Sequence, residues 1–475
     1  MKLYEDIAKH WSDRIESGHL RAGDKLEPVR IAKEIHQVSS ATVVAAYELL
    51  QAQGYVHARR GSGFYVNHLP LKTSRFELDK EEMDRAPVTP QPVQKQDLIR
   101  SLFASLKKSE VINLGSAVPD EAILPQQMIL KAFHHVLKTQ RKSLLSYEDS
   151  AGNLELRRLL AKRMAIMDCP VATEDIVITN GCQEALYLVL KEITQPGDMI
   201  AIESPIYYGL LQIFESLQLK AIEIPTDAQL GISLDALTLA LEHWPIKACI
   251  VISNGNNPQG FVMPDEMQEK LVSLCRNKNI HLIEDDIYGD LHFAARRTGT
   301  CRRYHDQVIY CSSFSKSLAS GLRVGWIASR QFANAISNQK TTLNIASPGV
   351  TQLVVAELLS TGKYDKHLRQ QRLQLVTAMR SLLDSIEKSF PEKIYFTRPV
   401  AGYVTWVKLP DICKINGTEL ASLALKEGIA IVPGLLFSTS EKYQRYIRLS
   451  SSGYWSDKKE KAVEVLGIIV KNHMP

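Results

Sequence analysis

The strongest constraint on the fold is an alternation of short β-branched runs with helical patterns, which begins near Val111 and continues to the end of the chain. Five of these runs have the composition of strands that are buried on both faces: Ile176–Thr179, Met199–Glu203, Ala248–Ser253, Ile280–Glu284 and Val308–Ser312. Buried strands that alternate with helices are typical of a largely parallel sheet covered by helices on both sides. Residues 111–475 are therefore predicted to form an α/β domain.

Residues 1–69 follow a different, helix-rich pattern. Apolar residues spaced by four and short capped segments predict three helices: one from Leu3 that Gly18 ends, one over Val29–Ile35 and one over Ala41–Gln53. Ser39 or Ser40 is well placed as the N-cap of the third helix. Two helices joined by a tight turn form a helix-turn-helix, and the third helix here would enter the major groove of DNA.

A predicted hairpin follows the third helix. Its strands are Tyr55-Val56 and Phe64–Val66, and Gly61 and Gly63 in the segment between them suit a hairpin turn. Arg59 and Arg60 stand beside this turn, where they could contact phosphates or the minor groove. A hairpin at this place in a helix-turn-helix domain is a wing.

A linker is predicted between the two patterned regions, over residues 70–110. Pro87, Pro90 and Pro92 remove backbone donors and block helix formation, so residues 86–96 should be extended. A short helix over residues 98–106 would follow.

The bulk properties permit a nucleic-acid partner without demanding one. The 475 residues carry a formal net charge of only +5, and a local basic patch matters more for DNA binding than the total. None of the 7 cysteines shows the C-x-x-C spacing of a zinc or redox site, so no metal site and a reducing compartment are expected. The charged N-terminus and the lack of a long apolar run predict a cytoplasmic protein.

The segment Ser313-Phe-Ser-Lys316 with Arg323-Val-Gly325 carries the strongest chemical signal. A lysine that forms a Schiff base with a phosphorylated aldehyde cofactor must lie near a fixed anion site. Ser313 and Arg323 could hold that phosphate. The alternative is a serine-rich loop with a surface lysine, which four other motifs argue against.

Each of these four motifs follows a predicted strand: Thr179–Ala185, Glu203–Gly209, Asn254–Gly260 and Glu284–Tyr288. In chain order they offer backbone N–H groups at a helix start for a phosphate, an aromatic ring for stacking, and a carboxamide for a phenolate oxygen. The last motif offers a carboxylate for a pyridine nitrogen. Each alone is ordinary loop or strand-end chemistry, but their agreement in order favours a pyridoxal 5'-phosphate site.

Both halves of the chain resemble known families. The N-terminal motifs resemble the GntR-family winged helix-turn-helix domain: Gly18–Leu26, Arg30, Ser39–Val43, Gly54 and Arg60–Val66. The resemblance implies DNA contacts at the start of the third helix and at the wing: Arg30, Ser39, Ser40, Ala41, Thr42, Arg59, Arg60 and Gly61. Ser40 departs from the family, which commonly has arginine there.

The C-terminal motifs resemble fold-type I pyridoxal-phosphate enzymes of the aspartate aminotransferase superfamily, over about residues 112–450. The resemblance implies a large mixed, mostly parallel sheet and a smaller C-terminal α+β subdomain. It implies that Lys316 forms the internal aldimine, that Asp285 faces the pyridine nitrogen and that Asn257 and Tyr288 hydrogen-bond the phenolate oxygen. Further implied contacts are a ring stack by Tyr207, phosphate contacts by Gly181, Cys182, Gln183, Ser313 and Arg323, a phosphate contact across a dimer by Tyr147, and a carboxylate contact by Arg448.

A GntR-type domain, a linker and an aminotransferase-type domain in this order resemble the MocR subfamily of bacterial regulators. The resemblance implies a homodimer, and two DNA-binding domains imply an operator with two half-sites. The cofactor motifs beside a DNA-binding domain lead to the hypothesis that an amine or amino-acid effector displaces Lys316, and that Arg448 holds its carboxylate if it has one. Turnover is not expected to be the physiological role, although residual aminotransferase activity is compatible with the motifs. Two alternatives stay open: a working aminotransferase with an accessory DNA-binding domain, and a regulator for which pyridoxal phosphate itself is the signal.

Overall fold

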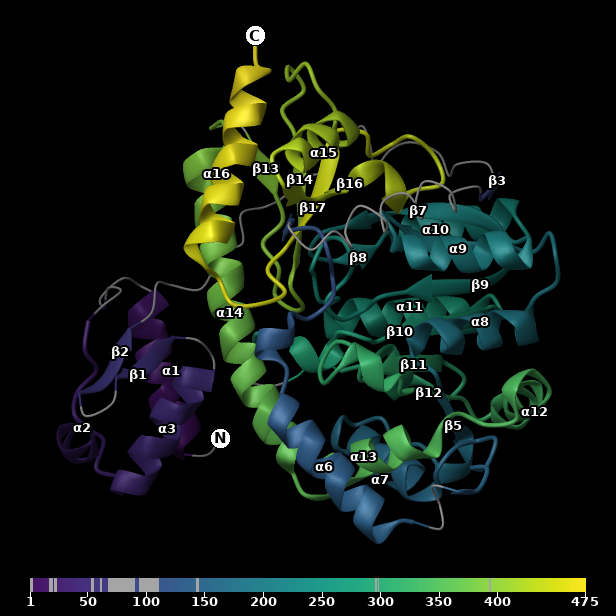
Figure 1. Cartoon of the computed structure of the whole chain (residues 1–475), viewed down its shortest axis with the longest axis horizontal. Helices are drawn as coiled ribbons and strands as arrows, with labels where there is room; N and C mark the ends of the chain where they lie inside the picture. The colour runs from purple at the N-terminus through teal and green to yellow at the C-terminus, as the bar shows by residue number, and fades with distance from the viewer. Residues whose placement is uncertain are drawn as a thin grey trace. The chain divides into compact units, whose positions relative to one another are not determined.

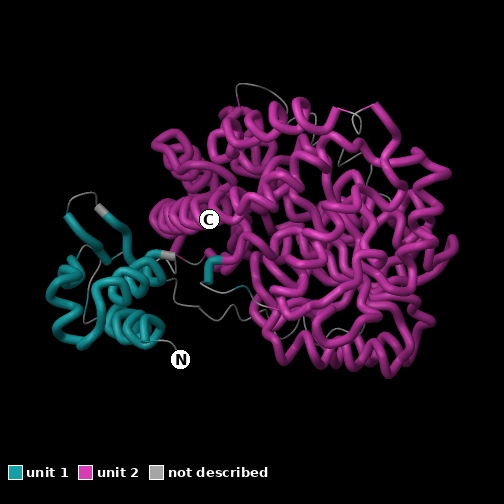
Figure 2. Tube along the Cα trace, turned by 90° about the horizontal axis from the view of Figure 1, so that it is seen from below, with its two compact units in different colours: residues 1–75, 293–297 teal, residues 76–292, 298–475 magenta. Residues whose placement is uncertain are grey.

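The structure is a computed structural model that describes residues 3–16, 20, 24–52, 55–59, 62–66, 90–93, 111–141, 145–294, 297, 299–392 and 394–475. The chain forms two compact units, one N-terminal and one C-terminal, which Figure 2 shows in different colours. Several sequence predictions lie outside the described residues: Gly18, Gly54, Arg60, Gly61, the helix over residues 98–106 and most of the linker. None of the described helices is long and apolar enough to cross a bilayer.

The N-terminal unit contains three helices and a hairpin: α1 (Leu3–Glu16), α2 (Val29–Ile35), α3 (Ser40–Ala52), β1 (Val56–Arg59) and β2 (Gly63–Val66). The strands pair antiparallel, with Val56 opposite Val66. Trp11 and Ile15 of α1 are fully buried with Tyr47 of α3 in the core of the unit, whereas Leu3 at the helix end is exposed. The predicted helix periodicity is thus confirmed except at its first position, where the helix extends beyond the core.

The start of α3 is stabilised by Ser39. Its hydroxyl oxygen accepts a hydrogen bond from the Thr42 backbone N–H at 3.1 Å, and the two side-chain oxygens lie 2.8 Å apart. This is the geometry of an N-cap, which satisfies an amide that the helix itself cannot pair. Of the two candidate caps in the sequence, Ser39 is the one that the structure uses.

The C-terminal unit is built on a nine-stranded mixed sheet, in the order β3-β7-β6-β9-β10-β11-β12-β5 with β8 paired to β7 (Figure 1). Its strands are β3 (Gln91–Pro92), β5 (Ile176–Thr179), β6 (Met199–Ser204), β7 (Lys220–Asp227), β8 (Gly231–Ile232), β9 (Ile246–Val251), β10 (His281–Asp285), β11 (Ile309–Ser313) and β12 (Gly325–Ala328). The strands β7, β6, β9, β10 and β11 are parallel to one another, and β12 is antiparallel to both β11 and β5. All five predicted strands are present, with ends shifted by up to two residues.

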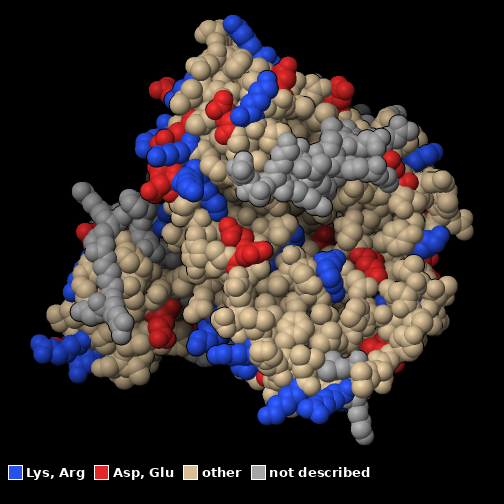
Figure 3. Space-filling model, in the orientation of Figure 1, with Lys and Arg blue, Asp and Glu red and all other residues tan. Residues whose placement is uncertain are grey.

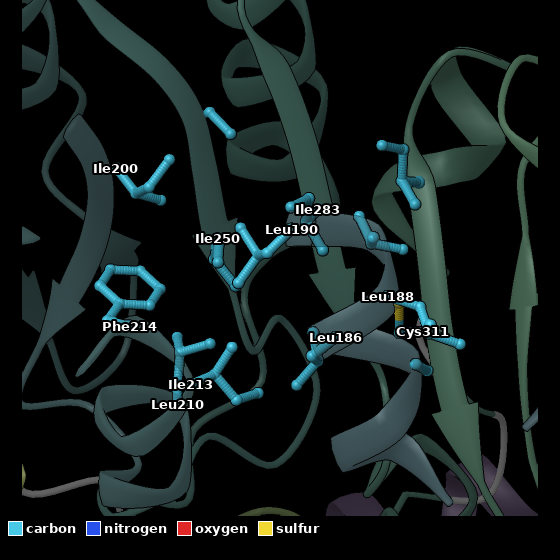
Figure 4. Packing of buried hydrophobic residues seen from close by; sticks show 14 of the residues in the cluster. Leu186, Leu188, Leu190, Ile200, Leu210, Ile213, Phe214, Ile250, Ile283 and Cys311 are labelled. Carbon is cyan, nitrogen blue, oxygen red and sulfur yellow. The ribbon is translucent and has the colours of Figure 1, made fainter. Parts of the chain in front are cut away.

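Helices cover both faces of this sheet because alternate residues of each strand point to opposite sides. Ile250 of β9 packs with α8 (Cys182–Ile193) and α9 (Tyr208–Leu217) on one face, as Figure 4 shows. The next residue, Val251, packs with α10 (Leu234–His243) and α11 (Asp265–Asn277) on the other face.

The remaining helices lie at the sides of the sheet and in the C-terminal subdomain. They are α6 (Gln126–Thr139), α7 (Leu154–Ile166), α12 (Ala333–Asn344), α13 (Gly349–Ser360), α14 (Lys363–Ser389), α15 (Gly417–Lys426) and α16 (Asp457–Asn472). Short 3₁₀ turns are present at Glu121–Ile123, Thr173–Asp175, Gly289–Leu291, Cys301–Tyr304, Ser320–Leu322 and Gly434–Phe437.

The smaller C-terminal subdomain contains an antiparallel sheet in the order β13-β14-β17-β16. Its strands are β13 (Tyr395–Phe396), β14 (Val404–Lys408), β16 (Val432–Pro433) and β17 (Tyr446–Ser450). A separate parallel pair joins β4 (Ile112–Asn113), at the start of the large unit, to β15 (Ile429–Ala430). This pair brings residues just after Asn113 beside β17, where they become part of the candidate site.

Four described residues fall within the predicted linker. Gln91 and Pro92 form β3, which pairs antiparallel with Ala221 and Lys220 at the edge of the large sheet. Val93 is buried in the core beneath the sheet. The backbone is extended there, as predicted, but it is paired with the domain rather than free of it.

Candidate functional site

The candidate site lies where five strands of the large sheet end. β5, β6, β9, β10 and β11 all point the same way, and most of the predicted site residues follow their carboxyl ends within a few positions. The exceptions are Tyr147, Arg323 and Arg448. Parallel strands present their carboxyl ends at one edge of a sheet, which is where α/β proteins bind ligands. The fold therefore brings together motifs that are up to about 130 residues apart in the chain.

Lys316 follows β11 and is partly buried. Its Nζ donates a hydrogen bond to the Ala117 backbone carbonyl at 2.6 Å and lies 6.0 Å from the centre of the Tyr288 ring. Burial, followed by the nearby Arg448 guanidinium, lowers the pKa of Lys316 to about 8. An amine with this pKa is partly neutral near physiological pH, the form that attacks a carbonyl carbon.

Asp285 ends β10 and is buried. Both hydrogen bonds that it accepts from described residues go to Oδ1, one from the Cys182 thiol and one from the Ile287 backbone N–H, each at 3.2 Å. Burial raises the pKa of Asp285 to about 6, and the two hydrogen bonds oppose that rise. The carboxylate can thus be ionised at neutral pH and can pair with a protonated ring nitrogen.

Asn257 and Tyr288 lie together beside Arg448. Asn257 Oδ1 accepts a hydrogen bond from Arg448 Nη1 at 2.9 Å. Burial raises the pKa of the Tyr288 hydroxyl, while Arg448 and a hydrogen bond with Asn257 oppose the rise. Tyr288 packs edge-on against the Tyr403 ring, which holds its orientation.

Arg448 has no solvent-exposed surface. It lies on β17, which has a neighbour on each side, β14 and β16. Besides Asn257, its guanidinium donates to the Gly115 carbonyl at 2.6 Å, but its Nε has no partner. Among the described residues no acidic side chain pairs with it. A buried cation without a carboxylate is costly, so the geometry favours an anionic ligand.

The predicted phosphate contacts gather at the start of α8. Gly181 has a φ of +94°, and a Cβ on it would lie 2.5 Å from Arg323 Nη2. Arg323 also donates to the Asn180 carbonyl at 2.5 Å and to Ser315 Oγ at 3.4 Å. Ser313 Oγ lies 2.8 Å from Ser315 Oγ. The exposed guanidinium, the two hydroxyl groups and the amides of the helix start are groups that can bind an anion.

Three predicted residues lie differently from the rest. The Gln183 side chain donates to the Gly209 carbonyl at 2.6 Å, so its amide group holds the protein rather than pointing to a ligand. Tyr207 is partly buried, its ring 5.0 Å from that of Tyr208. Tyr147 has 82% of its surface exposed, so it does not belong to the site within its own chain.

Comparison with known proteins gives two family matches. Residues 3–66 match the bacterial regulatory proteins of the gntR family, and residues 109–466 match aminotransferase class I and II. The chain is 34% identical to the HTH-type transcriptional regulator YdcR and 32% identical to YjiR, both of Escherichia coli, over the whole length of all three chains.

The chain belongs to the MocR subfamily of GntR-family transcriptional regulators. Solved structures support the cofactor of this MocR regulator. Kynurenine aminotransferase of Pyrococcus horikoshii is 25% identical with a TM-score of 0.75, and the alignment covers 84% of this chain and 98% of the other. LysN of Thermus thermophilus, solved with a phosphopyridoxyl-leucine compound, is 26% identical with a TM-score of 0.72 over 79% and 94% of the two chains. The cofactor is pyridoxal 5'-phosphate, and the regulator is PLP-dependent.

The residues of this MocR regulator fit that cofactor. A side chain at Gly181 would fill the space beside Arg323 that a phosphate needs. Asp285 offers an acceptor for a ring nitrogen, Asn257 and Tyr288 offer donors for a phenolate oxygen, and Lys316 offers the amine. These residues could therefore hold the phosphate, the ring and the aldehyde carbon of one bound molecule.

Sequence reasoning missed a polar face of α14 that contacts the backbone at Lys316. Gln371 Nε2 donates to the Lys316 carbonyl at 3.3 Å, and His367 Nε2 lies 3.0 Å from the Ser317 carbonyl. Tyr364 OH lies 2.6 Å from Ser317 Oγ. The spacing of these three residues places them on one helix face, so three polar residues on the buried side of an amphipathic helix were the available signal.

Five of the predicted DNA contacts lie among the residues whose side chains the structure describes, and none of the five is buried. Arg30 is exposed on α2, and Ser39, Ser40 and Ala41 are exposed where α3 begins, with Thr42 partly covered. In the space-filling view, basic side chains gather over the part of this unit that contains α2 (Figure 3). The helix-turn-helix of a GntR domain binds DNA, and the exposure of these residues is compatible with that role.

Proposed function

We propose that this PLP-dependent regulator senses a small primary amine or amino acid at the Lys316 site, and that occupation of the site controls its binding to DNA. The observation that carries the proposal is Arg448, a fully buried guanidinium with no acidic partner among the described residues, in a chain that also holds a DNA-binding unit. An effector carboxylate would complete the pairing of Arg448 bidentately.

The cofactor supplies an aldehyde that reacts reversibly with primary amines. Lys316 would hold it, and Asp285 would keep a proton on its ring nitrogen. Asn257 and Tyr288 would bind its phenolate oxygen, while Tyr207 stacks on its ring. Its phosphate would accept hydrogen bonds from the turn at Gly181, Cys182 and Gln183, through backbone amides, and from Ser313 and Arg323.

The effector would lie between Arg448 and Lys316. Arg448 would bind the effector's carboxylate, and the effector's amine would lie beside Lys316 Nζ. The Lys316 side chain could then move away from the Ala117 carbonyl that it contacts. The helix α14 contacts the carbonyls of Lys316 and Ser317 and leads into the C-terminal subdomain. A shift of the backbone at Lys316 would therefore also move α14. Coupling to DNA requires that the effector bind two arrangements of the protein unequally.

We also propose that two copies of the chain form a homodimer in the cytoplasm that reads an operator with two half-sites. Large apolar side chains are exposed on the loop of Leu145 and Tyr147 and at Leu343 and Ile345, the end of α12. These segments are neighbours, because Lys340 of α12 donates to the Ser150 carbonyl at 2.9 Å. A second copy of the chain would cover these exposed apolar side chains. Tyr147 of each copy would then contact the phosphate of the cofactor bound by the other copy. In this arrangement residues 1–69 bind DNA, 70–110 connect and 111–475 bind the effector.

Transamination is a second candidate function. The specific observation in its favour is that Lys316, Asp285, Asn257, Tyr288 and Arg448 are all brought together in a fold shared with working aminotransferases. Transamination has no use for the exposed arginine of α2 or for the wing. The fold of the large unit alone does not decide between effector sensing and transamination.

The test is the visible absorption spectrum of the cofactor-loaded, full-length protein titrated with amino acids, and with matched amines that lack a carboxylate, in the absence of a keto acid. We expect a stable spectral shift with one compound. Arg448→Gln should weaken the response to an amino acid at least about 30-fold and change the response to a matched amine little. Unchanged amino-acid affinity in Arg448→Gln would contradict the assignment, and release of a keto acid would establish transamination. A response to none of these compounds would favour the cofactor itself as the signal.

A further inference from the structure

One hydrogen bond connects the start of α8 with the end of β10. Cys182 is the first residue of α8 and Asp285 the last of β10, and Cys182 Sγ lies 3.2 Å from Asp285 Oδ1. The exposed fractions of the two residues are only 4% and 5%. A carboxylate can only accept, so the thiol is the donor.

The surroundings of the thiol keep it in the donor form. Burial, and then the neighbouring Asp285 carboxylate, raise the pKa of Cys182 well above its ordinary value. A thiolate at this place would repel Asp285, whereas the protonated thiol stabilises its charge. Cys182 is therefore a structural donor rather than a nucleophile.

The second donor to Asp285 acts on the same oxygen. The Ile287 backbone N–H also meets Oδ1, at 3.2 Å. Rotation about the bond between Cβ and the carboxyl carbon is soft, so donors set the plane of such a group. With both donors on Oδ1, the described contacts leave Oδ2 as the acceptor for a ligand.

We propose that Cys182 is a positioning residue that connects the two ends of the cofactor site. Its backbone belongs to the turn that receives the phosphate, and its thiol orients Asp285 so that Oδ2 faces the pyridine nitrogen. This inference rests on the proposed assignment of Asp285 and of the phosphate turn.

Three variants of the full-length chain separate this role from simple packing. Cys182→Ala removes the donor, and Cys182→Ser replaces it with a hydroxyl donor of similar size. Cys311→Ala is the matched control, because Cys311 is a buried thiol on β11 whose Cα pairs with Asp285 in the sheet and which makes no hydrogen bond to that carboxylate in the described contacts.

The readouts are the affinity for pyridoxal 5'-phosphate and the pH midpoint of the visible absorption of the bound cofactor. For Cys182→Ala we expect about threefold to tenfold weaker binding and a midpoint shifted by roughly half a unit. Cys182→Ser and Cys311→Ala should stay near the wild type. Equal effects of Ala and Ser at position 182, or an effect of Cys182→Ala no larger than that of Cys311→Ala, would overturn the inference. A wild-type protein that binds the cofactor but ignores every effector would contradict the proposed sensing and leave this test intact.

Discussion

The two units of this regulator carry their functional residues in opposite ways. The N-terminal unit has an apolar core of Trp11, Ile15 and Tyr47, and it places Arg30 and the start of α3 on the surface. The large unit buries several of its functional groups, among them Arg448 and Asp285, and orients them with hydrogen bonds. DNA is a large polyanion that approaches a surface, whereas a small ligand must be enclosed by oriented groups. A single substitution should therefore weaken DNA binding only in part when it falls in the first unit, whereas it should strongly weaken ligand binding when it falls in the second.

The largest effect is expected for Lys316→Ala. This variant should lose the visible absorption of the lysine-bound cofactor and every effector-dependent change in DNA affinity, because no other described side chain can replace the amine. Binding to duplex DNA without effector should stay within about threefold of the wild type. The measurement is fluorescence anisotropy with an operator selected by the protein from random duplexes. If the Lys316→Ala variant still bound DNA in an effector-dependent way, effector sensing would not depend on the Lys316 site of the large unit.

The next effect is expected for Gly181→Ala. The added methyl would lie 2.5 Å from Arg323 Nη2 at a backbone φ of +94°, which is strained for any residue with a Cβ. We expect the affinity for the cofactor to fall at least about tenfold, or roughly 1.4 kcal/mol. Equilibrium dialysis would measure it, with Gly197→Ala as control, since that glycine also has a positive φ but no atom within 4 Å of its missing Cβ. Similar losses in both variants would show that backbone strain, rather than the phosphate turn, is responsible.

Lys316 also predicts a pH dependence of the cofactor-free protein. Its folded pKa of about 8 lies below the value for an unfolded lysine. Between these two values the unfolded state binds more protons, so stability rises with pH, and below about pH 8 the buried charge costs stability. Lys316→Met should therefore stabilise the cofactor-free large unit at pH 7 by about 1–2 kcal/mol, after allowance for partial exposure. Thermal melts at pH 7 and pH 10 would test this. An equal difference between wild type and variant at both pH values would be contrary to it.

The smallest effect is expected for Arg30→Ala on the exposed face of α2. Loss of one phosphate contact should weaken binding to all duplex sequences about equally, and should lower the slope of log affinity against log salt by about 1. Arg158→Ala is the control, because Arg158 is an exposed arginine of the large unit. A salt slope unaffected by Arg30→Ala would remove Arg30 from the DNA interface.

Much of the architecture was predictable because local patterns carry it. The bounds of α2 and β5 agree with the sequence prediction, since β5 is a short apolar run and α2 lies between Pro28 and the turn that starts at His36. β12 was missed, because its four residues include Gly325 and it is recognisable as a strand only from its antiparallel partners β11 and β5. The docking of Gln91 and Pro92 on β7 was missed because a proline-rich run resembles a free linker.

The sequence by itself determined the two-unit organisation, the DNA-binding family and the cofactor, because the motif order and the periodicity are local properties that need no contacts to be read. Only the tertiary structure decided which side chains share a partner. Arg448 meets the Gly115 carbonyl, 333 positions away, and Cys182 meets Asp285 across 103. Burial of Arg448 in a central strand and the donation of the Cys182 thiol depend on how sheets and helices pack, and that packing is a property of the whole chain.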